Sequence, residues 1–314
     1  MRFALLSLLF WACLGAFGCA FGAAPNVVVT IKPLHSIVSS VMQGVASPTL
    51  LLPDTASPHT FALKPSTLRA LQSADLIVWG GPSLELFMAK SMTQARPNQA
   101  VITLSELPGL IHLKTRTGRA WQANDHDHDH DHNHENNNTL DPHLWLSTDN
   151  AEKIAQAVQA QLSRLDPDPS HIALYQRNTQ DFKEKMHALR ATLNAKLANA
   201  HTQAYLVYHD GYHYFEEEFK LNAVGTLVLN PHVPLSAQAI QEIGELIKTQ
   251  HVQCVFRETE FDDTRVRHLL QNFSVKVAEL DPLGTHFPAG PDHYEKTLLQ
   301  IGETLSGCLS TVKK

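Results

Sequence analysis

The chain has 314 residues, a formal charge of −6 at neutral pH, 43% hydrophobic residues and 18% charged residues. It is therefore too long for one small domain and too apolar for a disordered protein, so one large or two medium domains are expected. The 25 Lys and Arg residues do not outnumber the 31 Asp and Glu residues, which argues against nucleic acid as a partner. The unusual feature is the 19 histidines in a chain with only four cysteines.

Residues 1–24 have the pattern of a secretory signal peptide. Arg2 is followed by an uncharged apolar stretch that ends in small residues, which predicts cleavage before Pro25. Two alternatives are an uncleaved membrane anchor, because 22 apolar residues can span a bilayer, and a lipid attached at Cys19. No later stretch is long and apolar enough to span a membrane, so the mature chain is expected to be soluble.

Short β-rich runs alternate with helical stretches in both halves of the mature chain. In the first half the predicted strands are Val27–Ile31, Thr49–Leu52, Leu76–Trp79 and Val101–Leu104, and the predicted helices are Leu34–Gln43, Pro65–Gln72 and Leu84–Gln94. In the second half the predicted strands are Tyr205–Tyr208, Val224–Leu229, Val252–Phe256 and Val275–Leu280. This alternation predicts an α/β fold with two lobes, each built on a mostly parallel sheet flanked by helices.

The section between the two halves is helical. A first helix is predicted over Ala151–Leu165, and the stretch 170–200 then contains no Gly or Pro and carries apolar residues at steps of three and four. An unbroken helix of this length would extend roughly 46 Å, enough to join two lobes, whereas a broken pair of helices is the alternative. The predicted organisation is an N-terminal lobe over 25–168, a long rigid connecting helix over 169–200 and a C-terminal lobe over 201–314.

Residues 124–138 alternate His and Asp and contain no apolar side chain, so a mobile surface loop is expected there. Neutral imidazoles bind Zn, Cu or Ni, which makes five histidines candidates for auxiliary, low-affinity metal binding: His126, His128, His130, His132 and His134. The affinity is expected to be modest because binding must order the loop. A solvated linker without function is the alternative.

A tight metal site needs ligands that are already in place, and ligands in α/β proteins gather beyond the carboxyl ends of the strands. His209 and Asp281 directly follow predicted strands, while His59 and His143 lie in loops of the first half. Three histidines and one carboxylate would give a four-coordinate site for a metal such as zinc. Two ligands come from each half, so the metal is expected between the lobes.

Several other residues lie near strand ends but are expected outside this site: His213, His232, His286 and Glu258. A further group is expected on the surface or on helix faces: His35, His171, His187, His201, His251, His268 and His293. Motifs of hydrolases, phosphate binding and dinucleotide binding are absent, which argues against an enzyme. A secreted zinc hydrolase remains an alternative, because three histidines with an open position also form a catalytic zinc site.

Removal of the signal peptide leaves two cysteines, Cys254 and Cys308. In an oxidising compartment a single pair is expected to form a disulfide. A cysteine-containing metal site is the alternative.

At these residues the chain resembles the periplasmic metal-binding proteins of zinc ABC importers, the ZnuA type, over the whole mature length. The resemblance is carried by the following motifs in this order: Leu51-Leu52-Pro53-Asp54 before His59, Asp75-Leu76-Ile77-Val78-Trp79, His143-Leu144-Trp145-Leu146-Ser147, Tyr208-His209-Asp210 before Tyr214-Phe215-Glu216, Cys254-Val255-Phe256, and Leu280-Asp281-Pro282-Leu283-Gly284-Thr285. A His/Asp-rich insertion before the second histidine is also typical of the zinc members.

The resemblance implies two α/β lobes joined by a long rigid helix, with metal held between them by His59, His143 and His209. It implies Asp281 or water as the fourth ligand, because Pro58 replaces the glutamate that some zinc members carry before the first histidine. It also implies the disulfide between Cys254 and Cys308.

The function that follows is that of a monomeric periplasmic solute-binding protein, which captures Zn²⁺ without chemical reaction and delivers it to an ABC-type import permease. Relatives that take manganese usually offer a carboxylate where His209 offers nitrogen, and three nitrogens favour zinc over manganese. A manganese-binding member of the family remains an alternative. So does a surface adhesin that binds metal incidentally.

Overall fold

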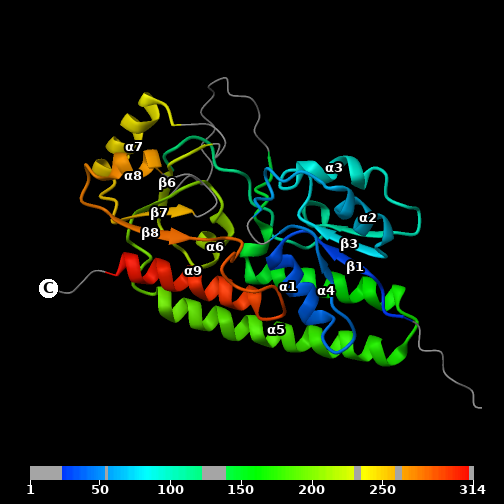
Figure 1. Cartoon of the computed structure of the whole chain (residues 1–314). Helices are drawn as coiled ribbons and strands as arrows, with labels where there is room; N and C mark the ends of the chain where they lie inside the picture. The colour runs from blue at the N-terminus through cyan, green and yellow to red at the C-terminus, as the bar shows by residue number, and fades with distance from the viewer. Residues whose placement is uncertain (1–22, 54–55, 122–138, 230–234, 259–263, 311–314) are drawn as a thin grey trace, which may run out of the picture.

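The computed structural model describes residues 23–53, 56–121, 139–229, 235–258 and 264–310. Two parallel four-stranded sheets lie side by side, with long helices along one side of both (Figure 1). In the N-terminal lobe the order β2-β1-β3-β4 arranges the strands Thr49–Leu50, Val27–Val29, Leu76–Trp79 and Ala100–Thr103. In the C-terminal lobe the order β6-β5-β7-β8 arranges Ala223–Thr226, Tyr205–Val207, Cys254–Glu258 and Lys276–Leu280. The predicted α/β architecture is confirmed.

The helices connect these strands and enclose the sheets. The N-terminal lobe contains α1 (Lys32–Val41), α2 (Pro65–Ser73), α3 (Leu86–Met92), α4 (Thr148–Leu165) and two short 3₁₀ turns, η1 (Leu104–Glu106) and η2 (Leu144–Leu146). After α5 (Pro169–Leu197) the C-terminal lobe contains α6 (His213–Glu218), α7 (Ala237–Thr249), α8 (Thr264–Leu270) and α9 (His293–Leu309).

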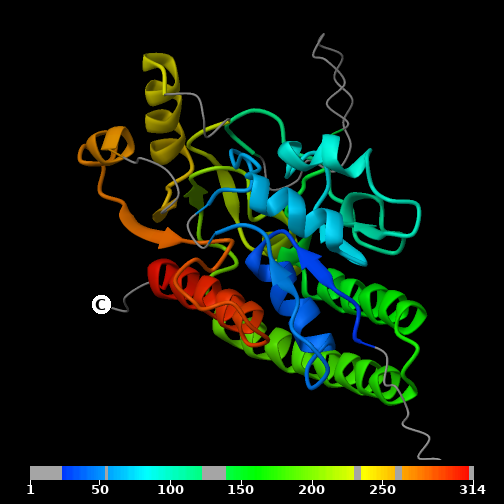
Figure 2. The same cartoon turned by 45° about the vertical axis from the view of Figure 1, so that its right-hand side comes forward.

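The connecting helix α5 is a single unbroken element of 29 residues, and it runs beneath both sheets (Figures 1 and 2). It begins at Pro169, whose fixed φ suits a first helical position, and the Asp168 carboxylate accepts a hydrogen bond from the Ser170 backbone N–H. Its buried stripe consists of Tyr175, Phe182, Met186, Leu189, Leu193 and Leu197. The prediction of one long helix rather than a broken pair is confirmed.

The last helix, α9, packs against α1 and α5 as well as against β8 of its own lobe. Polar contacts join the loop before α9 to α1, because the buried Lys32 ammonium donates to the carbonyls of Thr285 and Phe287 at 3.0 Å each. The hydroxyl of Ser36 donates to the carbonyl of Pro291 at 3.0 Å. The C-terminal part of the chain is thereby attached to the N-terminal lobe.

A segment of the first half, residues 113–121, passes from the N-terminal lobe to the C-terminal lobe. There it adds an antiparallel bridge to β6, the edge strand of the C-terminal sheet. Ala120 forms an antiparallel bridge with Gly225 of β6. The two segments approach closely, because a Cβ added at Gly225 would lie 2.2 Å from the carbonyl oxygen of Arg119. The Arg116 guanidinium forms an ion pair with Asp210 and lies 3.5 Å above the centre of the Trp121 ring. The predicted domain limits at residues 168 and 201 stay predictions. The structure adds that the lobes exchange segments: α9 packs on α1 of the N-terminal lobe, and residues 113–121 pack on the C-terminal lobe.

The two mature cysteines form the predicted disulfide, which joins the first residue of β7 to the last turn of α9. The predicted signal peptide falls outside the described residues except for its last two positions. Within the described ranges no helix is long and apolar enough to cross a bilayer.

Glu85 is fully buried in the loop after β3, and this carboxyl should make stability depend on pH. One oxygen accepts hydrogen bonds from the backbone N–H groups of Gly80 and Gly81 at 2.8 and 3.2 Å. Burial raises the pKa of Glu85 to about 7, although the hydrogen bonds with Thr30, Gly81 and Gly80 act in the opposite direction. Because the folded state binds the proton more tightly than the unfolded chain, stability should fall as pH rises from about 4.5 to about 7.

Glu85→Gln should therefore raise the free energy of unfolding by up to roughly 3 kcal/mol at pH 8 and change it little at pH 4.5, since the amide oxygen can still accept from both glycines. Urea denaturation at the two pH values measures this. Glu303→Gln is the matched surface control, and it should cost less than about 1 kcal/mol at either pH. An equal effect of Glu85→Gln at both pH values would contradict the assignment.

Candidate metal site

The three histidines expected as ligands come together where the two lobes meet. His59 lies in the loop after β2, His143 directly precedes η2, and His209 lies two residues beyond the end of β5. One nitrogen of each ring lies within 4.8 Å of those of the other two. Among the described residues, this is the one group of three or more His, Cys, Asp or Glu that lie so close together. His143 and His209 are buried, and His59 is half-buried.

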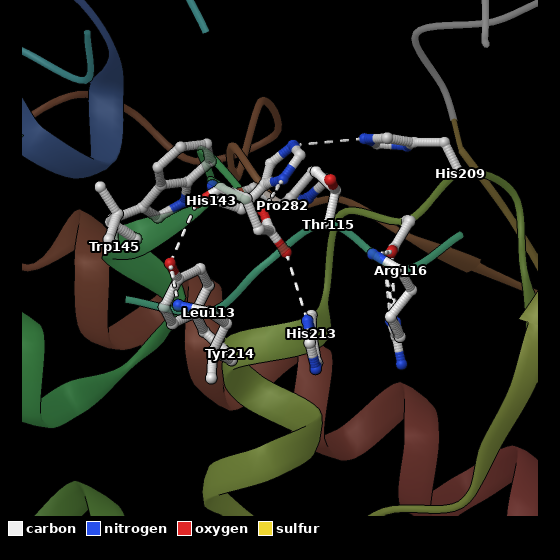
Figure 3. Close-up of polar contacts among 12 residues, drawn as sticks. Leu113, Thr115, Arg116, His143, Trp145, His209, His213, Tyr214 and Pro282 are labelled. Atoms are coloured by element: carbon white, nitrogen blue, oxygen red, sulfur yellow. Dashed lines mark hydrogen bonds and ion pairs between the residues drawn. The ribbon is translucent and has the colours of Figure 1, made fainter. Parts of the chain in front are cut away.

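Two of these rings are held by buried carboxylates. Asp141 lies 2.8 Å from Nδ1 of His143, and Glu258, the last residue of β7, lies 2.8 Å from Nδ1 of His209. A carboxylate at Nδ1 fixes the tautomer that carries hydrogen on Nδ1, which leaves the lone pair of Nε2 available for a metal. The two Nε2 atoms face each other at 3.3 Å (Figure 3), so both lone pairs are available to one metal ion.

Burial of Asp141 would raise its pKa, but the charge and hydrogen bonds of His143 outweigh burial and hold the pKa below its usual value. The second oxygen of Asp141 lies 3.8 Å from Nδ1 of His213, the first residue of α6 (Figure 3). His213 therefore lies behind the site rather than in it. Burial lowers the pKa of His213, and the nearby Arg116 lowers it further.

Apolar residues share the lining of the pocket with the histidines. Pro58, Trp145, Pro282 and Leu283 line a space of about 10 Å³ together with the three rings. The indole N–H of Trp145 donates to the carbonyl of Pro282 at 2.9 Å. The three rings and these apolar side chains thus form the lining of one small pocket.

The structure does not bring Asp281 into the group of three histidines. One of its oxygens accepts from the backbone N–H groups of Leu283 and Gly284, and the other accepts from the N–H and the hydroxyl of Thr285. This carboxylate therefore organises its own loop. Among the described residues, no fourth His, Cys, Asp or Glu joins the three histidines.

The remaining histidines are dispersed. His286 lies 3.4 Å from Glu279 on the surface. His35 and His293 were expected on the surface or on helix faces, and they lie in α1 and α9. Both are buried rather than exposed, and Nε2 of each ring contacts a backbone carbonyl, that of Pro48 for His35 and that of Leu283 for His293. His232 and the five histidines of the loop 124–138 lie outside the described residues.

Sequence reasoning did not find the role of Asp141 and placed Glu258 outside the site. The role of Asp141 has a local signal in the Asp141-Pro142-His143 sequence. The Asp141 carboxylate accepts a hydrogen bond from the backbone N–H of His143 at 3.0 Å, which forms a local turn. Glu258 is 49 residues from His209 in the chain, and only the pairing of β5 with β7 brings them together.

Asp141→Asn should weaken zinc binding by about 10- to 100-fold, because the neutral amide no longer strengthens the basicity of the His143 ring. Competition with a chromophoric chelator measures the affinity. Asp166→Asn is the matched control: Asp166 is also buried and bonded to a histidine, His171, but at the start of α5. Equal zinc affinities of the two variants would contradict the role given to Asp141.

The chain is similar to known zinc-uptake proteins over most of its length. A family model described as the periplasmic zinc-uptake complex component A, ZnuA, matches residues 27–308. The high-affinity zinc uptake system protein ZnuA of Brucella suis biovar 1 (strain 1330) is 36% identical over 312 residues, covering 92% of this chain and 93% of that protein. The protein of the same name from Yersinia pestis is 31% identical over 295 residues, covering 91% and 92%.

Solved structures share the fold. A crystal structure of ZnuA has a TM-score of 0.75 at 22% identity and covers 91% of this chain and 100% of that chain. The periplasmic zinc binding protein TroA from Treponema pallidum has a TM-score of 0.75 at 21% identity and covers 92% and 100%. Two parallel-sheet lobes on a long helix are thus the arrangement that these proteins have in common with this chain.

Proposed function

The chain belongs to the family of periplasmic ZnuA components of zinc-uptake complexes, and from that premise we propose that it captures Zn²⁺ between its lobes and presents it to an ABC-type import permease. The observation that carries the proposal is the convergence of His59, His143 and His209, with ligand nitrogens within 4.8 Å of one another. Three imidazole nitrogens favour zinc over manganese, which prefers oxygen ligands.

The three histidines hold the ion in this proposal, and a water molecule completes the tetrahedron. Asp281 is assigned to the loop because both of its oxygens already accept hydrogen bonds. The proposal includes no catalytic step, because the matching family and the curated relatives are zinc-uptake proteins. It acts in the periplasm as a monomer after cleavage of the signal peptide.

The test is a zinc titration of the full mature chain, purified without an affinity tag, with metal content measured by elemental analysis. One tightly bound zinc per monomer is expected, with the mass of the particle measured by light scattering on the same sample. Absence of tight zinc binding, or clearly less than one tightly bound zinc per chain, would overturn the proposal.

The loop 124–138 is proposed to bind additional zinc weakly. Deletion of these residues should remove the weak equivalents and leave the tight one, because the three proposed ligands lie outside the loop. Isothermal titration with excess zinc measures both classes of site. Replacing the five histidines of the loop by Asn is a control that preserves its length, and loss of the tight equivalent in either variant would contradict this division of roles.

A further inference from the structure

We infer that Arg116, from the first half of the chain, is a positioning residue of the proposed zinc site: through Asp210 it fixes the loop that carries His209. The inference rests on the proposed function and adds to it a residue that is not a candidate ligand. Arg116 and His209 lie on the same side of the site (Figure 3). A ligand that the C-terminal lobe supplies is thus held in place by the N-terminal half of the chain.

The loop that carries His209 is tight. It spans residues 208–212, between the end of β5 and the start of α6. The backbone N–H of Gly211 donates to the carbonyl of His209 at 2.8 Å, and the imidazole lies over this glycine, because a Cβ added there would lie 2.6 Å from Nε2 of the ring. Nε2 is the nitrogen that faces His143 at 3.3 Å. A shift of this backbone would therefore move the nitrogen that is available to the metal.

Arg116 binds this loop and the helix that follows it with one guanidinium. Its Nε donates to the two carboxylate oxygens of Asp210 at 3.1 and 3.2 Å, and its backbone N–H donates to one of them at 3.3 Å. Its terminal nitrogen donates to Asp210 and also to Glu216 of α6, the latter at 2.7 Å. The side chain of Glu216 is 3% exposed, and its other oxygen accepts from the hydroxyl of Tyr205, the first residue of β5, at 3.1 Å. The residue after His209 is thereby anchored to a buried polar cluster.

The guanidinium of Arg116 is itself held in place. It lies 3.5 Å above the centre of the Trp121 ring, and 18% of the side chain is exposed. The segment that carries it is attached to the chain before His143, because the backbone N–H of Asp141 donates to the carbonyl of Leu113 at 2.9 Å. Asp141 supports the ring of His143. One segment of the chain is therefore bonded to the supports of two proposed ligands.

The charge of Arg116 and its anchoring role have opposite effects on zinc affinity. A cation near a metal ion repels it, so removal of the charge alone would tighten zinc binding. Removal of the anchor frees the loop of His209, so it would weaken zinc binding. Lysine keeps the charge but lacks the planar fork that binds two carboxylates and stacks on an indole. The sign of the change in affinity therefore separates the two roles.

The test is competition for zinc with a chromophoric chelator, on the full mature chain and its variants. Arg116→Gln should weaken zinc binding by roughly tenfold or more, and Arg116→Lys should weaken it less but in the same direction. The double variant Arg116→Gln/Asp210→Asn leaves the net charge of the pair unchanged. Its affinity should stay close to that of Arg116→Gln, because Arg116 acts through Asp210 and the losses of two residues in one network do not add.

Arg190→Gln is the matched control. Arg190 of α5 also forms ion pairs with carboxylates of both lobes, Asp149 of α4 and Glu218 at the far end of α6, neither of which adjoins His209 in the chain. Its replacement should lower stability to urea, as replacement of Arg116 should, but leave the zinc affinity of the folded protein unchanged.

Zinc binding as tight as in the wild type, or tighter, in Arg116→Gln or in the double variant would overturn the inference. So would an equal loss of affinity in Arg190→Gln. The proposed function would stand in each of these cases, because it depends on tight zinc binding by the wild type. A wild type that does not bind zinc tightly would overturn both.

Discussion

His143→Ala and His209→Ala should each weaken zinc binding by well over 100-fold, more than the loss of a supporting carboxylate would. Each substitution removes one of three nitrogens that lie within 4.8 Å of one another, and it leaves a buried carboxylate, Asp141 or Glu258, without its histidine. Two imidazoles and water do not preorganise a zinc site. His59→Ala should act in the same direction. Chelator competition with the purified variants measures all three affinities.

His286→Ala is the control for this series, because His286 is an exposed histidine that pairs with Glu279 and does not line the site. Its zinc affinity should equal that of the wild type. Circular dichroism must show that each variant is folded before its affinity is compared. Tight zinc binding by His143→Ala or His209→Ala would show that the metal is held elsewhere.

Replacement of both Cys254 and Cys308 by Ser should lower the free energy of unfolding by about 4 kcal/mol, because the disulfide closes a loop across a sequence separation of 54 residues. Zinc affinity of the folded variant should change little, since Cys254 begins β7 while Glu258, at the other end of the strand, supports His209. Urea denaturation with and without zinc measures both quantities.

A reductant supplies the control for the disulfide. It should lower the stability of the wild type to that of the double variant and leave the double variant unaffected. A double variant within about 1 kcal/mol of the wild type would contradict the chain-entropy argument.

The strands, the connecting helix and the three histidines were predictable because each leaves a local signal. Alternating apolar runs predicted strands, an uninterrupted stripe predicted α5, and the carboxyl ends of strands predicted the edge of the sheets at which the three histidines come together. Strand-end position does not reveal which way a side chain points. Asp281 lies at that edge, and its loop turns the carboxylate toward backbone amides.

What the sequence could not predict depends on contacts between distant segments. Glu258 reaches His209 only through the pairing of parallel strands, and His293 is buried because the loop around Leu283 covers it. A histidine on a helix face looks the same in sequence whether solvent or a loop lies above it. The edge pairing of Ala120 with Gly225 likewise follows from no local pattern.

The exchange of segments between the lobes has a consequence for how the chain folds. In the N-terminal lobe, α1 packs against α9, which comes from the end of the second half. In the C-terminal lobe, the edge strand β6 pairs with residues 119–121 of the first half. Each half thus completes its packing with a segment of the other half, unlike separate domains that fold in turn as a chain emerges. The full native packing of either lobe should therefore form only in a chain that contains both halves. The group of three histidines, which draws on both lobes, requires both halves in the same way.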